Sequence, residues 1–257
     1  MAYGVRVGIR VNNAAVLEEL DRRFPPGWKP AASPVVERLY SFVSGGIGER
    51  SGLRSFNILY ADALRVARTM DREEALATLE SQIQLYVAEH AQRRVFVHAG
   101  VVGWKGQAIV IPGRSFSGKS TLVASLLDAG ATYYSDEYAV LDERGWVHPY
   151  PKPLALRTEA GEDLVKPSVE PPRGPSAKPL PVGMVVSTSY RRGGRWRPQQ
   201  MSPGRGVLAL LANTVPARRR PAASLRTLQQ AVSHALVLQG ARGEAEEAAA
   251  SLLRQAA

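Results

Sequence analysis

Residues 108–121 read AIVIPGRSFSGKST, and this stretch sets the fold that the sequence predicts for the centre of the chain. Residues 113–120 satisfy the pattern G-x-x-x-x-G-K-[ST] without a mismatch. The apolar run 108–111 before the pattern predicts a strand, and the apolar spacing of residues 121–128 after it predicts a helix that ends at Gly130. A strand, a glycine-containing loop and a helix in this order are typical of a loop that binds phosphate.

The residue types of this loop suit the binding of a nucleoside triphosphate and a magnesium ion. Gly113 and Gly118 allow the backbone to curl so that successive N–H groups face phosphate oxygens, beside the positive end of the helix. Lys119 can reach the β- and γ-phosphates, and the Ser120 hydroxyl can ligate Mg²⁺. ATP and Mg²⁺ are therefore the expected cofactors. The expected nucleotide-binding residues are Gly113, Arg114, Ser115, Phe116, Ser117, Gly118, Lys119, Ser120 and Thr121.

A loop of this kind also needs an acid for the metal ion and, in a transfer reaction, a base for the attacking group. Two places in the sequence offer a suitable carboxylate. Asp136 and Glu137 are adjacent carboxylates between apolar runs, one helix and one short strand beyond Lys119. Asp142 ends an apolar run, but Asp-Glu-Arg-Gly at 142–145 is also typical of a hairpin turn. We favour Asp136 and Glu137 for the site, and a turn for Asp142.

A change of sequence pattern near residue 93 predicts two domains, a small α+β layer over residues 1–92 and a larger α/β domain over residues 93–257. Alternation with period two predicts strands, and apolar residues at helical spacing predict helices. In the first domain we expect strands at 4–11, 35–43, 56–60 and 64–67, and helices at 14–24 and after Asp71. In the second we expect strands at 95–102, 108–111, 133–134, 138–141, 182–187, 196–201 and 234–238, and helices at 121–128, 206–212, 224–232 and 244–255.

The composition excludes several classes of protein. The sequence has no cysteine, which excludes disulfide scaffolds, thiolate zinc sites, iron–sulfur clusters and cysteine nucleophiles. Its apolar stretches are far shorter than the roughly 20 residues of a membrane span, and its N-terminus lacks the apolar core of a signal peptide. We therefore expect a soluble, cytoplasmic protein without a membrane partner. The 33 Lys and Arg residues against 23 Asp and Glu leave a formal net charge of +10, which suits a phosphate-containing ligand, a nucleic acid or anionic lipid.

Two arginine clusters stand outside the phosphate loop, at residues 191–197 and 218–220. Trp196 interrupts the first cluster, as a stacking ring does in some nucleic-acid binders. The Gly193-Gly194 pair instead indicates a solvated hairpin, and prolines on either side of the second cluster indicate a turn there as well. We favour turns and expect no nucleic-acid partner. The clusters would equally suit an acidic or phosphorylated substrate.

Four segments resemble the catalytic domain of HPr kinase/phosphorylase and related bacterial serine kinases. They are Phe96-Val97-His98-Ala99-Gly100, Ile109-Val110-Ile111-Pro112-Gly113, Ser117-Gly118-Lys119-Ser120 and Ser135-Asp136-Glu137. The resemblance covers residues 94–160 and implies a P-loop kinase domain with a mixed sheet, similar in plan to phosphoenolpyruvate carboxykinase. Residues 148–157, HPYPKPLALR, also resemble a stretch of small stand-alone members of this group.

The resemblance implies a role for each of the site residues. Asp136 is implied as the general base for the attacking hydroxyl, and Lys119 as the phosphate-binding lysine. His98 matches the family's histidine ahead of the loop, and we expect it to contact Asp136 or the γ-phosphate. Glu137 stands where the family has a second Asp and is implied to ligate the metal ion together with Asp136 and Ser120.

The resemblance thereby implies an enzyme that transfers the γ-phosphoryl group of ATP to a serine or threonine hydroxyl of a peptide or protein, for instance the precursor peptide of a modified natural product. Arg157 is a candidate contact to phosphate or substrate. Related kinases assemble into homo-oligomers, so a homo-oligomer is also implied. From the residues alone two other functions stay open: a kinase of a small hydroxylated metabolite, and a nucleotide-gated ATPase or binding module.

Overall fold

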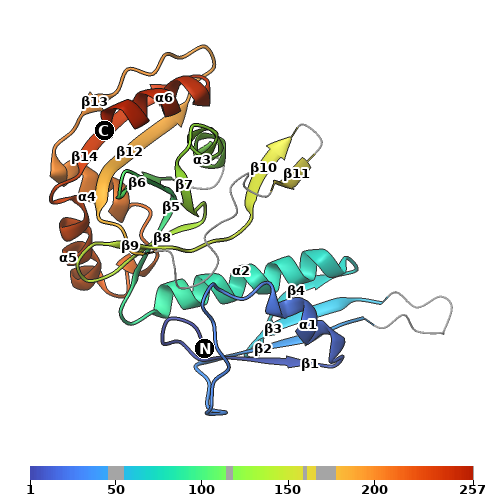
Figure 1. Ribbon diagram of the computed structural model, residues 1–257. Coiled ribbons are helices and arrows are strands. Elements are labelled where there is room, and N and C mark those ends of the chain that lie inside the picture. The colour runs from blue at the N-terminus through green and yellow to red at the C-terminus, as the bar shows by residue number, and fades with distance from the viewer. Residues whose placement is uncertain (46–54, 114–117, 159–160, 166–177, 257) are drawn as a thin grey trace. The chain divides into compact units, whose positions relative to one another are not determined.

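The computed structural model describes residues 1–45, 55–113, 118–158, 161–165 and 178–256, with the backbone alone for 155–158 and 161–165. The chain is mixed α/β, as the sequence predicts, and divides into two compact units, Met1–Gln92 and Arg93–Ala257 (Figure 1). Among the helices in these described ranges, none has both the length and the apolar character that crossing a bilayer requires.

In the N-terminal unit the described residues form a four-stranded sheet and two helices. The strand order is β1-β2-β3-β4, with β1 parallel to β2 and the other pairs antiparallel. Helix α2 begins where the Asp71 side chain accepts hydrogen bonds from the N–H groups of Glu73 and Glu74, at 2.8 and 3.2 Å, which confirms the predicted cap. The elements are β1 (Val7–Val11), α1 (Ala15–Asp21), β2 (Arg38–Val43), β3 (Asn57–Ala61), β4 (Leu64–Thr69) and α2 (Arg72–His90).

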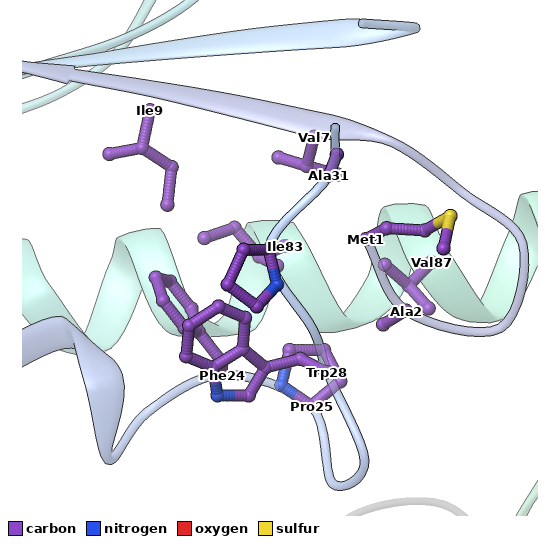
Figure 2. Close-up of a pocket in the computed structure, with 11 residues that line it drawn as sticks. Met1, Ala2, Val7, Ile9, Phe24, Pro25, Trp28, Ala31, Ile83 and Val87 are labelled. Carbon is purple, nitrogen blue, oxygen red and sulfur yellow. The ribbon is translucent and has the colours of Figure 1, made fainter. Parts of the chain in front are cut away.

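An apolar pocket of about 190 Å³ lies in this unit, between β1 and α2 (Figure 2). Val7 and Ile9 of β1 face Ile83 of α2 across it, and the rings of Phe24 and Trp28 lie beside them with centroids 4.7 Å apart. Every side chain that lines the pocket is apolar. The pocket therefore presents no side chain for acid–base chemistry or for a metal ion.

The C-terminal unit is built on an eight-stranded mixed sheet. Its strand order is β13-β14-β12-β6-β5-β8-β9, and β7 also pairs with β5. Strands β6, β12 and β14 are mutually parallel, so their carboxyl ends lie at one edge of the sheet, whereas β5 is antiparallel to β6. The strands are β5 (Val95–Trp104), β6 (Gln107–Pro112), β7 (Thr132–Ser135), β8 (Tyr138–Leu141), β9 (Val147–His148), β12 (Val182–Tyr190), β13 (Gln199–Gln200) and β14 (Leu236–Arg242), with a separate hairpin of β10 (Leu154–Thr158) and β11 (Gly161–Val165).

Helices cover both faces of this sheet, which explains why its central strands read as continuous apolar runs. Ile109 and Ile111 of β6 pack on the face covered by α3 (Lys119–Asp128) and α6 (Ala245–Gln255). Val110, between them, packs on the opposite face, covered by α4 (Pro203–Leu211) and α5 (Pro221–Val232) (Figure 1). A short 3₁₀ turn, Val215–Ala217, connects α4 and α5.

The hairpin predicted at residues 191–197 is wrong, although a turn is present. The N–H of Gly194 donates to the carbonyl of Arg191 at 2.8 Å, which closes the turn. The strands on either side of it do not pair, because β14 lies between β12 and β13 in the sheet and β13 pairs antiparallel with β14. The strand expected at 196–201 is reduced to Gln199–Gln200, and Trp196 is buried in the core beneath it.

Candidate functional site

Strand β6 leads directly to the predicted phosphate loop at the carboxyl edge of the sheet. The N–H of Gly113 donates to the carbonyl of His98 at 3.2 Å, so the loop starts against β5. The loop ends at Gly118, whose φ of 79° lies in the left-handed region that favours glycine, and α3 begins at Lys119. The expected nucleotide-binding residues Arg114, Ser115, Phe116 and Ser117 lie outside the described residues.

A short hydrogen bond joins the first turn of α3 to the predicted acid. The hydroxyl of Ser120 donates to Oδ2 of Asp136 at 2.6 Å, and Asp136 stands in the turn between β7 and β8. Gly100 of β5 makes this approach possible, because a Cβ there would lie only 2.6 Å from Cγ2 of Val123 in α3 and 3.6 Å from Oδ1 of Asp136. The fold therefore brings together the hydroxyl of Ser120, which is predicted to ligate a metal ion, and the predicted acid Asp136.

Burial dominates the electrostatics of Asp136 and of the neighbouring Lys119. Burial raises the pKa of Asp136 to about 6, although the hydrogen bond from Ser120 and the charge of Lys119 both oppose the rise. Burial also lowers the pKa of Lys119, against the negative charges of Asp136 and Glu137. The structure thus holds a lysine and a carboxyl group in one desolvated site. The charged form of each, ammonium or carboxylate, is less favourable there than in water.

The oxygen atoms of this site fit a magnesium ion. Oδ1 of Asp136 is buried and has no hydrogen-bond partner among the described residues, and Oδ2 is shared with the Ser120 hydroxyl. Mg²⁺ in proteins usually takes one or two carboxylates and completes its shell with substrate phosphates and water. Ser120 and Asp136 would therefore hold the ion. In the part of the chain that the structure describes, no three His, Asp or Glu side chains gather as a cation site.

His98 and Glu137 form a second, more open pair beside Asp136. Nδ1 of His98 lies 3.8 Å from Oε1 of Glu137, beyond hydrogen-bond length, and the side chains are 40% and 43% exposed. Burial lowers the pKa of His98, against the charge of Glu137, so the ring is neutral at neutral pH and the pair is no salt bridge. The expected contact from His98 to Asp136 is therefore replaced by an approach to Glu137. A contact from His98 to a γ-phosphate stays a prediction.

The remaining candidate residues lie around this group. Thr121 is exposed in the first turn of α3. Arg157 lies in β10, where the structure describes only its backbone, paired with Glu162 of β11. Asp142 is a turn residue, as favoured: its Oδ1 accepts from the N–H groups of Arg144 and Trp146, both at 3.0 Å. It takes no part in the site.

Sequence reasoning missed Arg242, at the end of β14. Its side chain is buried, with Nη2 donating to the carbonyl of Gly118 at 2.7 Å and Nη1 to the carbonyl of Gly243 at 3.0 Å. The C=O and N–H of one trans peptide point in opposite directions, so the hydrogen bond that holds the Gly118 carbonyl turns the N–H of Lys119 the other way. Arg242 therefore sets the orientation of a loop peptide. No local pattern marks it, because its partner lies 124 residues away.

Asp136→Asn is expected to stabilise the nucleotide-free protein at neutral pH. Folding raises the pKa of this carboxyl from 3.8 to about 6, so its ionisation destabilises the folded state. This destabilisation is complete when the pH is above the folded-state pKa, and it is absent when the pH is below the unfolded-state pKa of 3.8. Asn cannot ionise, and the expected gain is about 1–3 kcal/mol, because one pKa unit corresponds to about 1.4 kcal/mol. Urea denaturation at neutral pH and below pH 3.8 measures it, and the gain should vanish at the lower pH.

Two other acids serve as controls for this measurement. Burial acts to raise the pKa of Asp142, but hydrogen bonds from His148, Trp146 and Arg144 outweigh it and hold the pKa below its usual value. Asp142→Asn should therefore destabilise the protein at neutral pH, whereas Asp128→Asn, on an exposed side chain, should change little. Loss of stability in Asp136→Asn at neutral pH would contradict the assigned burial of the carboxylate.

Comparison with known proteins assigns no family to this chain. Neither a scan against protein-family models nor a search of curated proteins gives a match to this chain.

Proposed function

We propose that this chain is an ATP-dependent kinase with a P-loop kinase fold of the HPr kinase type, acting on a serine or threonine hydroxyl of a peptide or protein. The observation that carries the proposal is the 2.6 Å hydrogen bond from Ser120 to Asp136. It supports a site in which the hydroxyl that ligates a metal ion, a buried carboxylate and Lys119 meet at the start of a helix, directly after a glycine-containing loop.

In the proposed reaction the acceptor hydroxyl oxygen attacks the γ-phosphorus of ATP. The hydroxyl proton passes to Asp136, the bond between the γ-phosphorus and the β–γ bridging oxygen breaks, and ADP leaves with that electron pair. A carboxylate whose pKa burial raises to about 6 is ionised at neutral pH and yet a better proton acceptor than an exposed one. Lys119 and the N–H groups of the loop stabilise the charge on the transferring group.

Bound Mg²⁺ would neutralise part of the charge of the phosphates, and Ser120 and Asp136 are the residues placed to hold it. Glu137 is the third expected ligand. Its side chain is 43% exposed and lies beside His98, so solvent and an acceptor can reach it.

The test is phosphoryl transfer from ATP labelled at the γ-phosphate, in the presence of Mg²⁺. Peptides that contain serine or threonine, and matched peptides with alanine in its place, are offered as acceptors, together with small polyols. We expect an acid-stable phosphoester on the hydroxyl peptides and none on the alanine peptides. Label on polyols alone would identify a metabolite kinase, and release of phosphate at one rate with or without acceptor would identify an ATPase. Absence of ATP binding would overturn the proposal.

Arg242→Met is expected to weaken ATP binding about tenfold, because a hydrogen bond from a charged group contributes roughly 1.5–3 kcal/mol and here fixes the peptide between Gly118 and Lys119. Isothermal titration of ATP with Mg²⁺ measures the change. Arg242→Lys keeps the charge without the planar fork and should fall between wild type and Arg242→Met. Arg254→Met, on an exposed arginine of α6, is the matched control. Wild-type affinity in folded Arg242→Met would contradict the positioning role.

A further inference from the structure

Acidic side chains and His98 lie on one side of the phosphate loop, and Tyr190 and Arg242 lie on the other. Strand β6, which leads to the loop, has β5 on one side and β12 on the other. The acid side holds His98 of β5 and the Asp136-Glu137 turn between β7 and β8. On the other side β12 ends at Tyr190 and β14 ends at Arg242, and these two residues are partners in the parallel register.

The basic side also carries part of the surplus positive charge. Residues 1–92 contain 11 Lys and Arg and 11 Asp and Glu, whereas residues 93–257 contain 22 and 12. Four exposed arginines follow Tyr190 directly, in a turn that we call the arginine turn: Arg191, Arg192, Arg195 and Arg197. The turn is tied to the sheet, because the N–H of Arg191 donates to the carbonyl of Arg242 at 2.8 Å and Trp196 is buried.

In-line transfer determines which substrate lies on which side, and this step rests on the function proposed above. The attacking oxygen, the γ-phosphorus and the leaving oxygen lie roughly on one line. Asp136 receives the hydroxyl proton, so the acceptor approaches from the acid side. The ADP portion would then extend away from Asp136, and the ends of β12 and β14, with Tyr190 and the arginine turn, lie on that other side of β6.

Tyr190 presents an aromatic surface at that position. Its side chain is 53% exposed, and its Cβ lies 3.9 Å from the position that a Cβ on Gly118 would occupy, so the ring starts beside the loop. The buried guanidinium of Arg242 lies 5.7 Å from the ring centroid and supports it. We infer that Tyr190 is the stacking surface for the base of the bound nucleotide, with the arginine turn beside the sugar and phosphates of the ADP portion.

A nucleic-acid strand fits this surface less well than a mononucleotide. Strand binding uses successive stacking rings along a basic groove. In the arginine turn the only aromatic side chain is Trp196, which is 7% exposed and belongs to the core. Tyr190, an exposed ring beside the described end of the loop at Gly118, suits a single base.

Titration with ATP, ADP and inorganic triphosphate, each with Mg²⁺, tests the inference. Tyr190→Ala should weaken ATP and ADP about tenfold, the usual order of effect for loss of base stacking, and leave triphosphate binding unchanged. Tyr190→Phe keeps the ring and should bind all three as wild type does. Trp146→Ala is the matched control, because Trp146 is also an exposed aromatic of this unit with an arginine, Arg144, 5.0 Å from its ring; it should change none of the three affinities.

Each result bears on one claim. Equal losses of ATP and triphosphate in Tyr190→Ala, or no loss of ATP, would overturn the base-stacking role and leave the proposed function intact. A wild-type protein that binds neither ATP nor triphosphate would overturn the proposed function itself. Binding of single-stranded DNA that depends on Tyr190, with ATP affinity unchanged by Tyr190→Ala, would assign the surface to nucleic acid and overturn the inference.

Discussion

Asp136→Asn is expected to lower the rate of phosphoryl transfer about a thousandfold, within the range that a general base contributes. The asparagine oxygen can still accept the hydrogen bond that Ser120 now donates to Asp136, so the start of α3 should keep its arrangement. The variant loses the carboxylate oxygen that we propose as the acceptor of the hydroxyl proton. ATP should still bind, and single-turnover transfer from labelled ATP should be almost absent.

Three controls make this result specific. Asp128→Asn changes an exposed carboxylate of the same helix that carries Ser120 and should transfer at the wild-type rate. Titration across Mg²⁺ concentrations separates a weaker metal site, which added Mg²⁺ restores, from a missing base, which it does not. The variant should also be more stable than wild type at neutral pH, so unfolding cannot explain its inactivity. Transfer retained by purified Asp136→Asn at high Mg²⁺ would rule out Asp136 as the base.

Lys119→Ala is expected to reduce kcat/KM for ATP by about 10²–10³-fold, the usual effect of removing one preorganised donor from a developing negative charge. Burial lowers the pKa of Lys119, and the negative charges of Asp136 and Glu137 oppose that lowering, as the phosphates of a bound nucleotide would. Unlike Asp136→Asn, this variant should lose both ATP affinity and turnover. Direct titration of ATP together with steady-state transfer distinguishes the two patterns.

Lys178→Ala supplies the control for charge alone, since Lys178 is an exposed lysine of the same unit. It should leave both ATP affinity and turnover unchanged. If Lys119→Ala binds ATP and transfers phosphate at wild-type rates, Lys119 does not act on the phosphates, and its proposed role in the transfer is wrong.

Strong local patterns predicted most of the secondary structure. The apolar run before the phosphate loop became β6, and the helix expected at 121–128 became α3, starting two residues earlier. Asp71 caps α2 because a short polar side chain ahead of a helix satisfies free N–H groups, whatever the rest of the fold does. These features depend on neighbours in the chain, so the sequence shows them directly.

The failed hairpin at 191–197 shows where such reasoning ends. A turn motif with glycines indicates that the chain reverses, and it does. Which strand fills the space beside β12 depends on a segment about 50 residues later, because β14 inserts between β12 and β13. The residues near the turn carry no pattern that shows which distant strand will pair with β12.

The candidate site divides in the same way. Lys119, Ser120 and Asp136 were recognisable from the sequence, since a loop of this pattern requires a lysine, a hydroxyl and an acid, and the hydrogen bond from Ser120 to Asp136 brings two of them together. Arg242 and Tyr190 were not recognisable. They reach Gly118 only because parallel pairing places the ends of β12 and β14 at the edge where β6 ends. The residues of the loop are consecutive in the sequence and carry its pattern by themselves, whereas Arg242 and Tyr190 come to its end at Gly118 only through long-range strand order.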